Sequence, residues 1–136
     1  MKALGTHIVC ELSGCGVDRL TDIDGVRKMM VEAAKAANAT IMESAFHRFE
    51  PQGVSGTVIL AESHLSIHTW PEKGYAAMDF YTCGDHTDPW LACEYAAKAL
   101  CAQAMRTTEI KRGIEAGNGS FTHLVTRVLD TAERSA

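Results

Sequence analysis

The stretch that decides the fold is VSGTVILAESHLSIHTWPEKGYAAMDFYT, residues 54–82. It holds three β-like runs, at 54–61, 64–70 and 75–82, and a fourth run at 40–49 comes just before it. The breaks between these runs contain Pro, Gly, Glu and Ser and are too short to hold a crossover helix. The spacing therefore predicts neighbouring strands that pair antiparallel, as a meander.

The sequence on either side of this meander has helical and strand-like segments. A strand-like run at 6–12 precedes a helical pattern at 22–37, in which apolar residues recur at helical spacing after an Asp22 N-cap. A second helix is predicted to begin at Asp88-Pro89 and to extend to about Ala104 (88–104). A further strand is predicted at 106–111, and we expect residues 120–136 to form a short helix or to fray.

These elements predict one domain spanning all 136 residues, 1–136. The fold class is α+β, a two-layer α/β sandwich in which an antiparallel sheet is covered on one face by two helices. The other face of the sheet then needs a cover of its own. Because a second copy of a chain this short is the simplest cover, we expect a homodimer.

Composition narrows the range of partners. The chain has 13 Lys and Arg against 17 Asp and Glu, a net charge of −4, and no long basic run. This argues against a nucleic-acid partner and against a membrane surface. No stretch resembles a membrane span or a signal peptide, and the five cysteines have no C-x-x-C spacing, so we expect free thiols in the cytoplasm and a small molecule or another protein as partner.

Chemically active side chains concentrate in AESHLSIHTWPE, residues 61–72. Two serine hydroxyls, two imidazoles and two carboxyls lie within this hairpin, and a thiol, Cys83, follows the next run. These groups are the components of nucleophilic and general acid–base chemistry. The segment is therefore the candidate active site.

One interpretation of this segment is a metal site. His64 and His68 would be ligands, with His7, His47 or His86 completing the coordination shell. A His-x3-His pair brings both imidazoles to one side only on a helix, however, and this segment has strand character. The pattern therefore disfavours a metal.

Two other interpretations stay open on the residues alone. A Ser-His-Asp hydrolase would take Asp79 or Asp85 as its acid, although the chain has no G-x-S-x-G motif. Alternatively, His64, Ser66 and His68 share one face of a strand by alternation and form a polar face at a surface or a dimer contact.

The order of residues in this region resembles the short bacterial and archaeal S-adenosylmethionine decarboxylases. The strings that carry the resemblance are ESHLSIHTWPE at 62–72, GYAAMD at 74–79 and TCG at 82–84, together with LG at 4–5, His7, Glu11, FHRF at 46–49, GVSG at 53–56 and DPW at 88–90. The likeness covers about residues 3–112. Residues 113–136 show none of these motifs, and we expect them to form a flexible tail.

The resemblance implies an enzyme that cleaves its own chain between Glu62 and Ser63. Ser63 Oγ would attack the Glu62 carbonyl to give an ester, and β-elimination followed by hydrolysis would convert Ser63 to a pyruvoyl group. His68 matches the residue that accepts a proton during this processing, a role suited to an imidazole. The products would be a β chain, 1–62, and an α chain, 63–136.

The resemblance also implies the reaction and its residues. The pyruvoyl group derived from Ser63 would form a Schiff base with S-adenosylmethionine and accept electrons as CO2 leaves, with no metal and no pyridoxal phosphate. Cys83 matches the proton donor of decarboxylation. Phe49 would stack on adenine, Glu72 would bind the ribose hydroxyls, and Glu11 would orient the processing site or the substrate amine. The product would be the aminopropyl donor for spermidine synthesis.

Two alternatives to this function remain. A pyruvoyl-dependent ornithine or arginine decarboxylase would keep the chemistry and change the substrate. A dimeric homologue that neither processes nor catalyses would keep only the fold.

Strand alternation raises one geometric difficulty for the implied site. Ser63 and His68 are five residues apart and would point to opposite faces of a regular strand. We therefore expect a turn or bulge near Ser63 to bring them together.

Overall fold

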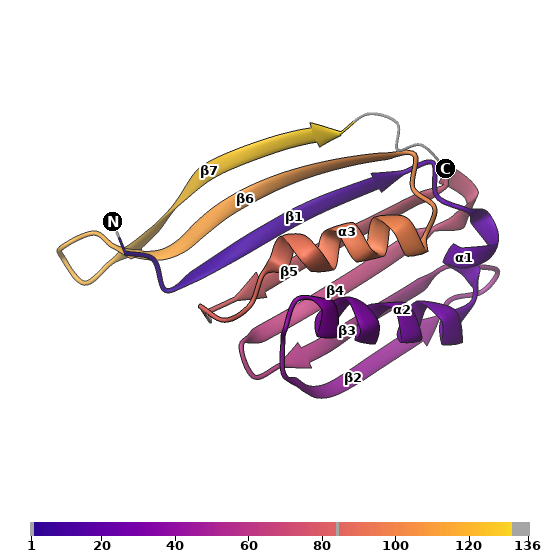
Figure 1. Cartoon of the computed structure of the whole chain (residues 1–136), viewed down its shortest axis with the longest axis horizontal. Coiled ribbons are helices and arrows are strands. Elements are labelled where there is room, and N and C mark those ends of the chain that lie inside the picture. The colour runs from indigo at the N-terminus through magenta and orange to yellow at the C-terminus, as the bar shows by residue number, and fades with distance from the viewer. Residues whose placement is uncertain (1, 84, 132–136) are drawn as a thin grey trace.

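The structure is a computed structural model, and it describes residues 2–83 and 85–131 (Figure 1). Its described residues form one antiparallel sheet in the order β2-β3-β4-β5-β1-β6-β7. The strands are β1 (Gly5–Ser13), β2 (Ile41–Arg48), β3 (Val54–Leu60), β4 (Ser63–Trp70), β5 (Tyr75–Thr82), β6 (Ala104–Glu115) and β7 (Phe121–Thr131). The helices are α1 (Val17–Thr21), α2 (Ile23–Ala36) and α3 (Pro89–Ala99), with a 3-10 turn, η1 (Pro71–Lys73).

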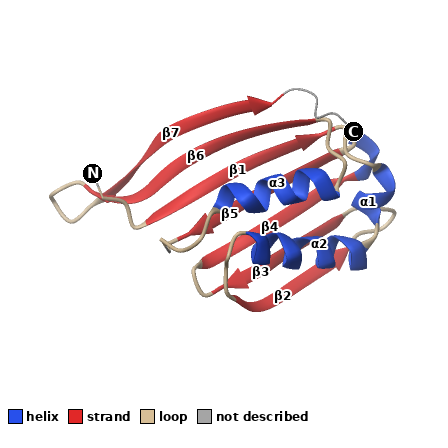
Figure 2. Cartoon of the chain, viewed as in Figure 1, coloured by secondary structure: helices blue, strands red, loops and turns tan. Residues whose placement is uncertain are grey.

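The helices lie on one face of the sheet, which confirms the two-layer α+β sandwich (Figure 2). Alternate residues of the central strands are buried against them. These residues are Ile8, Cys10 and Leu12 of β1, Leu65 and Ile67 of β4, and Met78 and Phe80 of β5. Helix α2 contributes Val26, Met29, Met30, Ala33 and Ala34 to the same core. Among the described residues, no helix is long and apolar enough to cross a membrane.

Both predicted helix N-caps are present. The Asp22 side chain accepts a hydrogen bond from the backbone N–H of Asp24, and the Asp88 side chain accepts one from Trp90. Each bond satisfies an N–H group that the first turn of a helix leaves unpaired. The predicted meander strands are also present in the predicted order, and they place β4 beside the centre of the sheet.

The prediction for the end of the second helix is wrong. Helix α3 ends at Ala99, and Ala104, predicted as its last residue, is the first residue of β6. The reversal occurs at Cys101, whose φ of 56° is left-handed and cannot continue a right-handed helix. The stripe of small apolar residues therefore extended past the true end of the helix. The short helix α1 was not predicted, because its five residues are too few to show a helical period.

The prediction for the C-terminal segment is also wrong. Residues 121–131 form β7, which pairs with β6 along its length, in place of a short helix or a frayed end. The expected flexible tail likewise differs from the hairpin that the structure gives to residues 113–131, while 132–136 lie outside the described residues. Gly117 and Gly119 have positive φ and form the hairpin turn. The prediction treated these glycines only as a break and not as a turn between two strands.

The face of the sheet opposite the helices carries polar and aromatic side chains. We call it the open face. His7 of β1, His64 and His68 of β4, and Asp79 and Tyr81 of β5 lie on it, because their neighbours along each strand face the helices. The chemically active residues of the sequence are thus gathered on the side of the sheet that the chain's own helices leave uncovered.

Candidate active site

Ser63 lies at a tight turn with unusual backbone geometry. Leu60 pairs with Ser63, so Ala61 and Glu62 alone connect β3 to β4. Two-residue hairpin turns normally use Gly, Asn or Asp, which tolerate positive φ. Here the positive φ, 143°, falls on Ser63 itself. A non-glycine residue in such a conformation costs on the order of 1–3 kcal/mol, so strain is concentrated at the Glu62–Ser63 peptide.

Hydrogen bonds hold both the side chain and the backbone carbonyl of Glu62. The Glu62 side chain is only 6% exposed, and its carboxylate accepts hydrogen bonds from Thr40 N at 3.0 Å and His86 Nε2 at 2.6 Å. Desolvation by burial opposes ionisation, but these hydrogen bonds outweigh it and lower the pKa of Glu62. The Glu62 carbonyl accepts the Cys83 N–H at 3.0 Å. The carbonyl carbon next to Ser63 is therefore fixed in place and polarised.

The Ser63 hydroxyl is at one end of a chain of hydrogen-bonding groups. Ser63 Oγ lies 3.4 Å from His64 Nδ1, and His64 Nε2 lies 2.7 Å from Asp79 Oδ2. His7 Nε2 reaches the same carboxylate oxygen at 2.7 Å, and the Ser66 hydroxyl donates to the other oxygen. Desolvation opposes ionisation of Asp79, but the hydrogen bonds from His7, Ser66 and His64 hold its pKa well below the ordinary value. Asp79 is therefore an ionised acceptor between two imidazoles.

His7, His64 and Asp79 also have the donor set of a metal site, with ligand atoms that all lie within 4.8 Å of one another. Arg112 Nη1 lies 3.2 Å from His7 Nδ1, and its guanidinium stacks 4.7 Å from the centre of the Tyr81 ring. Since Arg112 can only donate, His7 Nδ1 accepts and Nε2 carries the proton. A metal at Nε2 would need the opposite tautomer next to a fixed positive charge. The arrangement therefore favours a hydrogen-bonded network.

His68 lies at the other end of β4. Its Nδ1 is 2.8 Å from Ser55 Oγ on β3, and its pairing partner on β5 is Ala77. Five residues of strand at about 3.3 Å each place His68 roughly 16 Å from Ser63. The unusual φ of Ser63 is the expected irregularity, but it turns the hydroxyl toward His64. Within one chain, the structure does not bring Ser63 and His68 together.

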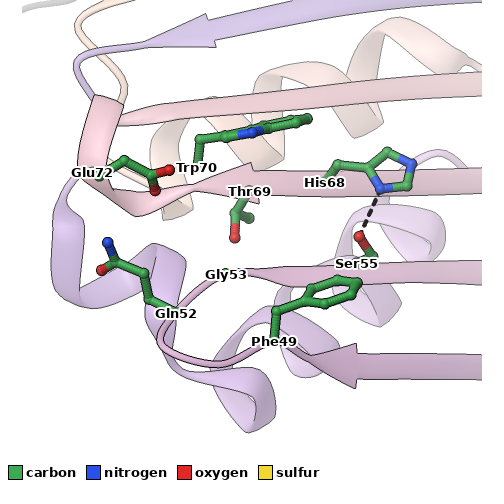
Figure 3. A pocket seen from close by; sticks show the side chains of 8 residues that line it. All are labelled: Phe49, Gln52, Gly53, Ser55, His68, Thr69, Trp70 and Glu72. Atoms are coloured by element: carbon green, nitrogen blue, oxygen red, sulfur yellow. Dashed lines mark hydrogen bonds between the residues drawn. The ribbon is translucent and has the colours of Figure 1, made fainter.

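A pocket lies beside His68. It is an open pocket of about 290 Å³, lined by Phe49, Gln52, Gly53, Ser55, His68, Thr69, Trp70 and Glu72 (Figure 3). Phe49 follows β2, Trp70 ends β4, and Glu72 lies in η1. The Phe49 and Trp70 side chains are 47% and 39% exposed, which leaves both rings available to a ligand. The structure thus places Phe49 and Glu72, both predicted substrate contacts, in one pocket.

Cys83 and Glu11 occupy different parts of the site. Cys83 follows β5 and is exposed, whereas Cys10, Cys15 and Cys93 are buried. Its backbone contact to Glu62 places it at the Ser63 end. Glu11 accepts a hydrogen bond from the Tyr75 hydroxyl and pairs with Ala77, the strand partner of His68. Glu11 is therefore level with His68 across the sheet and far from Ser63 along the strand direction.

The candidate residues form two groups. We call the group around Glu62, Ser63, His64, Asp79 and Cys83 the cleavage centre, and the group lining the hollow of Figure 3 the side pocket. Ser55 and Trp70 were not singled out from the sequence, and His86 was considered only as a metal ligand. Ser55 and Trp70 both lie inside the quoted strings. Strand alternation from His68 was a usable signal for Trp70, whereas Ser55 meets His68 through the pairing of β3 with β4. The contact of His86 with Glu62 spans 24 positions and left no local signal.

The chain is similar to known proteins along most of its length. The model of the S-adenosylmethionine decarboxylase family matches residues 6–113. An S-adenosylmethionine decarboxylase proenzyme from Caldicellulosiruptor saccharolyticus is 55% identical over 114 residues, 84% of this chain and 92% of that protein. One from Carboxydothermus hydrogenoformans is 56% identical and covers 84% and 90%. The crystal structure of the adenosylmethionine decarboxylase from Aquifex aeolicus superposes with a TM-score of 0.79 at 38% identity, covering 88% of this chain and 99% of that one. The chain therefore belongs to the S-adenosylmethionine decarboxylase family.

Proposed function

We propose that this chain is a proenzyme that cleaves itself between Glu62 and Ser63 and then decarboxylates S-adenosylmethionine. The observation that carries the proposal is the strained Ser63, next to a carbonyl that the Cys83 N–H holds, in a chain of this family. The product, decarboxylated S-adenosylmethionine, is an aminopropyl donor, which fits a role in spermidine synthesis.

The cleavage centre has the groups that self-cleavage requires. Ser63 Oγ attacks the Glu62 carbonyl carbon, and the peptide becomes an ester with a free Ser63 amine. Loss of the Ser63 α-proton then expels the Glu62 carboxylate and leaves dehydroalanine, which water converts to a pyruvoyl group and ammonia. The carboxylate that leaves is the main-chain carboxylate of residue 62. The hydrogen bonds to the buried Glu62 side chain keep that residue in place. The resulting chains are 1–62 and 63–136.

The position of Ser63 fits a pyruvoyl prosthetic group. Ser63 is the first residue of β4 and part-buried at a hairpin end, so cleavage there leaves a new chain terminus without removing a strand. When present, the group supplies a ketone that withdraws electrons from the substrate α-carbon as CO2 leaves. Cys83 is exposed, and its backbone N–H contacts the Glu62 carbonyl, which supports a role for its thiol as the proton donor to that α-carbon. This chemistry requires neither a metal nor pyridoxal phosphate.

The side pocket supplies groups that suit a nucleoside with a sulfonium. The Phe49 and Trp70 rings offer faces for an adenine and for the sulfonium cation, and the Glu72 carboxylate can accept hydrogen bonds from ribose hydroxyls. A small diamino acid has no ring system to stack on these aromatic faces. The pocket therefore supports S-adenosylmethionine over ornithine or arginine.

The separation of the two groups supports a homodimer with shared sites. His68 is roughly 16 Å from Ser63 along its own strand, too far for proton transfer. The open face carries exposed apolar side chains, Val9, Ile59, Trp70, Val125 and Val128, that a second copy would cover. A twofold axis crossing β4 near its middle would set the Ser63 end of one copy against the His68 end of the other. His68 would then serve as a processing base for the cleavage centre of the partner subunit, and Glu72 would bind the substrate at that centre.

Mixing two inactive variants tests this arrangement. Ser63→Ala and His68→Ala chains, each uncleaved alone, should yield cleaved His68→Ala chains when unfolded and refolded together, because the mixed dimer has one complete site. Sedimentation should give a dimer mass. A monomer, or a mixture that stays uncleaved, would contradict shared sites.

Substrate specificity is tested by 14CO2 release from carboxyl-labelled S-adenosylmethionine, ornithine and arginine in parallel. We expect release from S-adenosylmethionine alone. Release only from ornithine or arginine would keep the chemistry and overturn the substrate. A chain that stays uncleaved and releases nothing would support the alternative of a non-catalytic homologue.

The Phe49→Ala variant should cleave normally but bind S-adenosylmethionine poorly. Stacking of a nucleic-acid base on an aromatic ring is worth about 1–3 kcal/mol, so KM should rise roughly 5- to 150-fold. Phe121→Ala, on the exposed β7, is the matched control and should leave KM unchanged. An unchanged KM for Phe49→Ala would remove Phe49 from the substrate site.

The location of the protein is proposed to be cytoplasmic. All five cysteines are free, which suits a reducing compartment. Recovery of the native protein in a membrane or extracellular fraction of the source cell would contradict this location.

A further inference from the structure

We infer that His64 is the base that starts self-cleavage by taking the proton of Ser63 Oγ, and that Asp79 is its positioning residue. This inference rests on the proposed self-cleavage at Glu62–Ser63 and assigns its first proton transfer. It separates that first step, carried out within one chain, from the later step in which His68 of a second copy would act.

The first support is the direction of the imidazole. His64 Nε2 lies 2.7 Å from Asp79 Oδ2, and an ionised carboxylate only accepts, so the proton of neutral His64 is on Nε2. The lone pair of Nδ1 is then free to accept, and Nδ1 is the atom 3.4 Å from Ser63 Oγ. This distance is long for a hydrogen bond, as catalytic contacts often are before the reacting groups close up.

The second support is the surroundings of Asp79. The groups that face it are His7 from β1, His64 and Ser66 from β4, and, beyond His7, Arg112 from β6. All of them donate to the carboxylate or stand behind a donor, which holds it as an anion. An anion 2.7 Å from Nε2 stabilises the imidazolium that forms when Nδ1 takes a proton.

The third support is the geometry of the scissile peptide. The φ of 143° points the Ser63 side chain toward the neighbouring His64, on the same hairpin end. The same residue carries the backbone strain that is released when the peptide bond opens. The Cys83 N–H, 3.0 Å from the Glu62 carbonyl oxygen, is in place to stabilise negative charge on that oxygen. Base, nucleophile and oxyanion donor thus converge on one bond.

The step balances without any further reactant. The Ser63 Oγ proton moves to His64 Nδ1 as the Oγ–C bond to Glu62 forms. The bond between the Glu62 carbonyl carbon and Ser63 N then breaks, and His64 Nδ1 returns its proton to that nitrogen. The products are an ester and a free amine, and His64 is neutral again at the end of the step.

The test follows cleavage of purified, freshly folded chains on a denaturing gel. His64→Gln keeps an amide that can donate to Asp79 but has no base facing Ser63. We expect its cleavage rate to fall by about 10²- to 10⁴-fold, the usual contribution of general base catalysis. His47→Gln, an exposed histidine on β2, is the matched control and should cleave at the wild-type rate.

Hydroxylamine separates this step from the later one. It splits esters and, among peptide bonds, only Asn–Gly, which this chain has at Asn118–Gly119 in every variant. It should therefore not release the fragment 1–62 from His64→Gln, which is blocked before the ester. It should release that fragment from His68→Ala, which is blocked after the ester. Added imidazole should restore cleavage of His64→Ala, a response that a merely structural role of His64 would not give.

Asp79→Asn is the test of the positioning residue. It should cleave slowly, because a neutral amide no longer stabilises the imidazolium that forms when His64 Nδ1 takes the proton. Asp79→Glu, which keeps the anion, should recover part of the cleavage rate, and an Asp79→Asn chain that is cleaved at the wild-type rate would remove this role from Asp79. Asp130→Asn, an acidic residue on β7, is the control.

The outcomes distinguish the inference from the proposed function. If the wild-type chain is never cleaved, the proposed function fails. If the wild type is cleaved at Glu62–Ser63 and His64→Gln is cleaved equally fast, the proposed function stands and the role of His64 is overturned. Release of the fragment 1–62 by hydroxylamine from His64→Gln would also overturn it. So would His64→Ala that stays uncleaved with imidazole.

Discussion

Replacing Ser63 by alanine should leave one uncleaved chain of 14.7 kDa with no detectable decarboxylase activity. Without Oγ no atom can attack the Glu62 carbonyl, and no residue can become the pyruvoyl group. The loss should be complete, because both cleavage and the prosthetic group depend on the same atom. A denaturing gel and 14CO2 release from labelled S-adenosylmethionine measure the two effects.

Ser44→Ala is the matched control for this variant. Ser44 is an exposed serine on β2, away from the cleavage centre, and its replacement should leave cleavage and activity unchanged. Normal cleavage of Ser63→Ala at the same position would end the hypothesis of self-processing through Ser63. Cleavage at another bond would move the site and keep only the decarboxylase family.

Replacing Cys83 by alanine should separate processing from turnover. The backbone N–H of residue 83 still holds the Glu62 carbonyl in this variant, so the chain should be cleaved. The thiol that we propose as the proton donor to the substrate α-carbon is gone, so kcat should fall by about 10²- to 10⁴-fold. The measurement is kcat for CO2 release from fully cleaved protein, with the cleaved fraction determined by mass spectrometry.

Cys101→Ala is a close control, because Cys101 is the other exposed cysteine. It should be cleaved and should turn over at the wild-type rate. A Cys83→Ala enzyme with wild-type kcat would remove Cys83 from the reaction. A Cys83→Ala chain that folds but is not cleaved would show that the side chain, and not only the backbone, acts in processing.

The parts of the fold that local physics determines were predictable from sequence. The strands of the meander follow from short breaks between β-like runs, and the starts of α2 and α3 follow from Asp22 and from Asp88-Pro89. The ends were not predictable in the same way. Helix α3 stops because Cys101 adopts a left-handed conformation, which no pattern of apolar residues reveals. Strand β7 owes its conformation to pairing with β6.

The site shows the same division between local and non-local information. The resemblance identified Ser63, Cys83, Phe49 and Glu72 as a set, and the structure brings Phe49 and Glu72 into one pocket and Cys83 beside the Glu62–Ser63 bond. Their roles remain predictions for the experiments above. Alternation along β4 raised the problem of Ser63 and His68 correctly. The expected turn near Ser63 is present, but it does not bring the two residues together, and the continuous pairing of β4 with both neighbours leaves no bulge.

Long-range contacts explain what the sequence could not give. The network of Asp79 with His7 and His64 joins β1, β4 and β5, and His7 is 72 positions from Asp79 in the chain. Asp79 was one of two acids considered for a triad, and only the sheet register places it opposite Ser66 and within reach of His64. The hydrogen bond between His86 and the Glu62 carboxylate is likewise visible only in the folded chain.

Intact mass spectrometry of the purified protein tests the central claim most directly. The account predicts two fragments, residues 1–62 and residues 63–136, with the second fragment blocked at its N-terminus by a pyruvoyl group in place of serine. A single uncleaved mass for the folded wild-type chain, or two fragments in which the second begins with an unmodified serine, would contradict it.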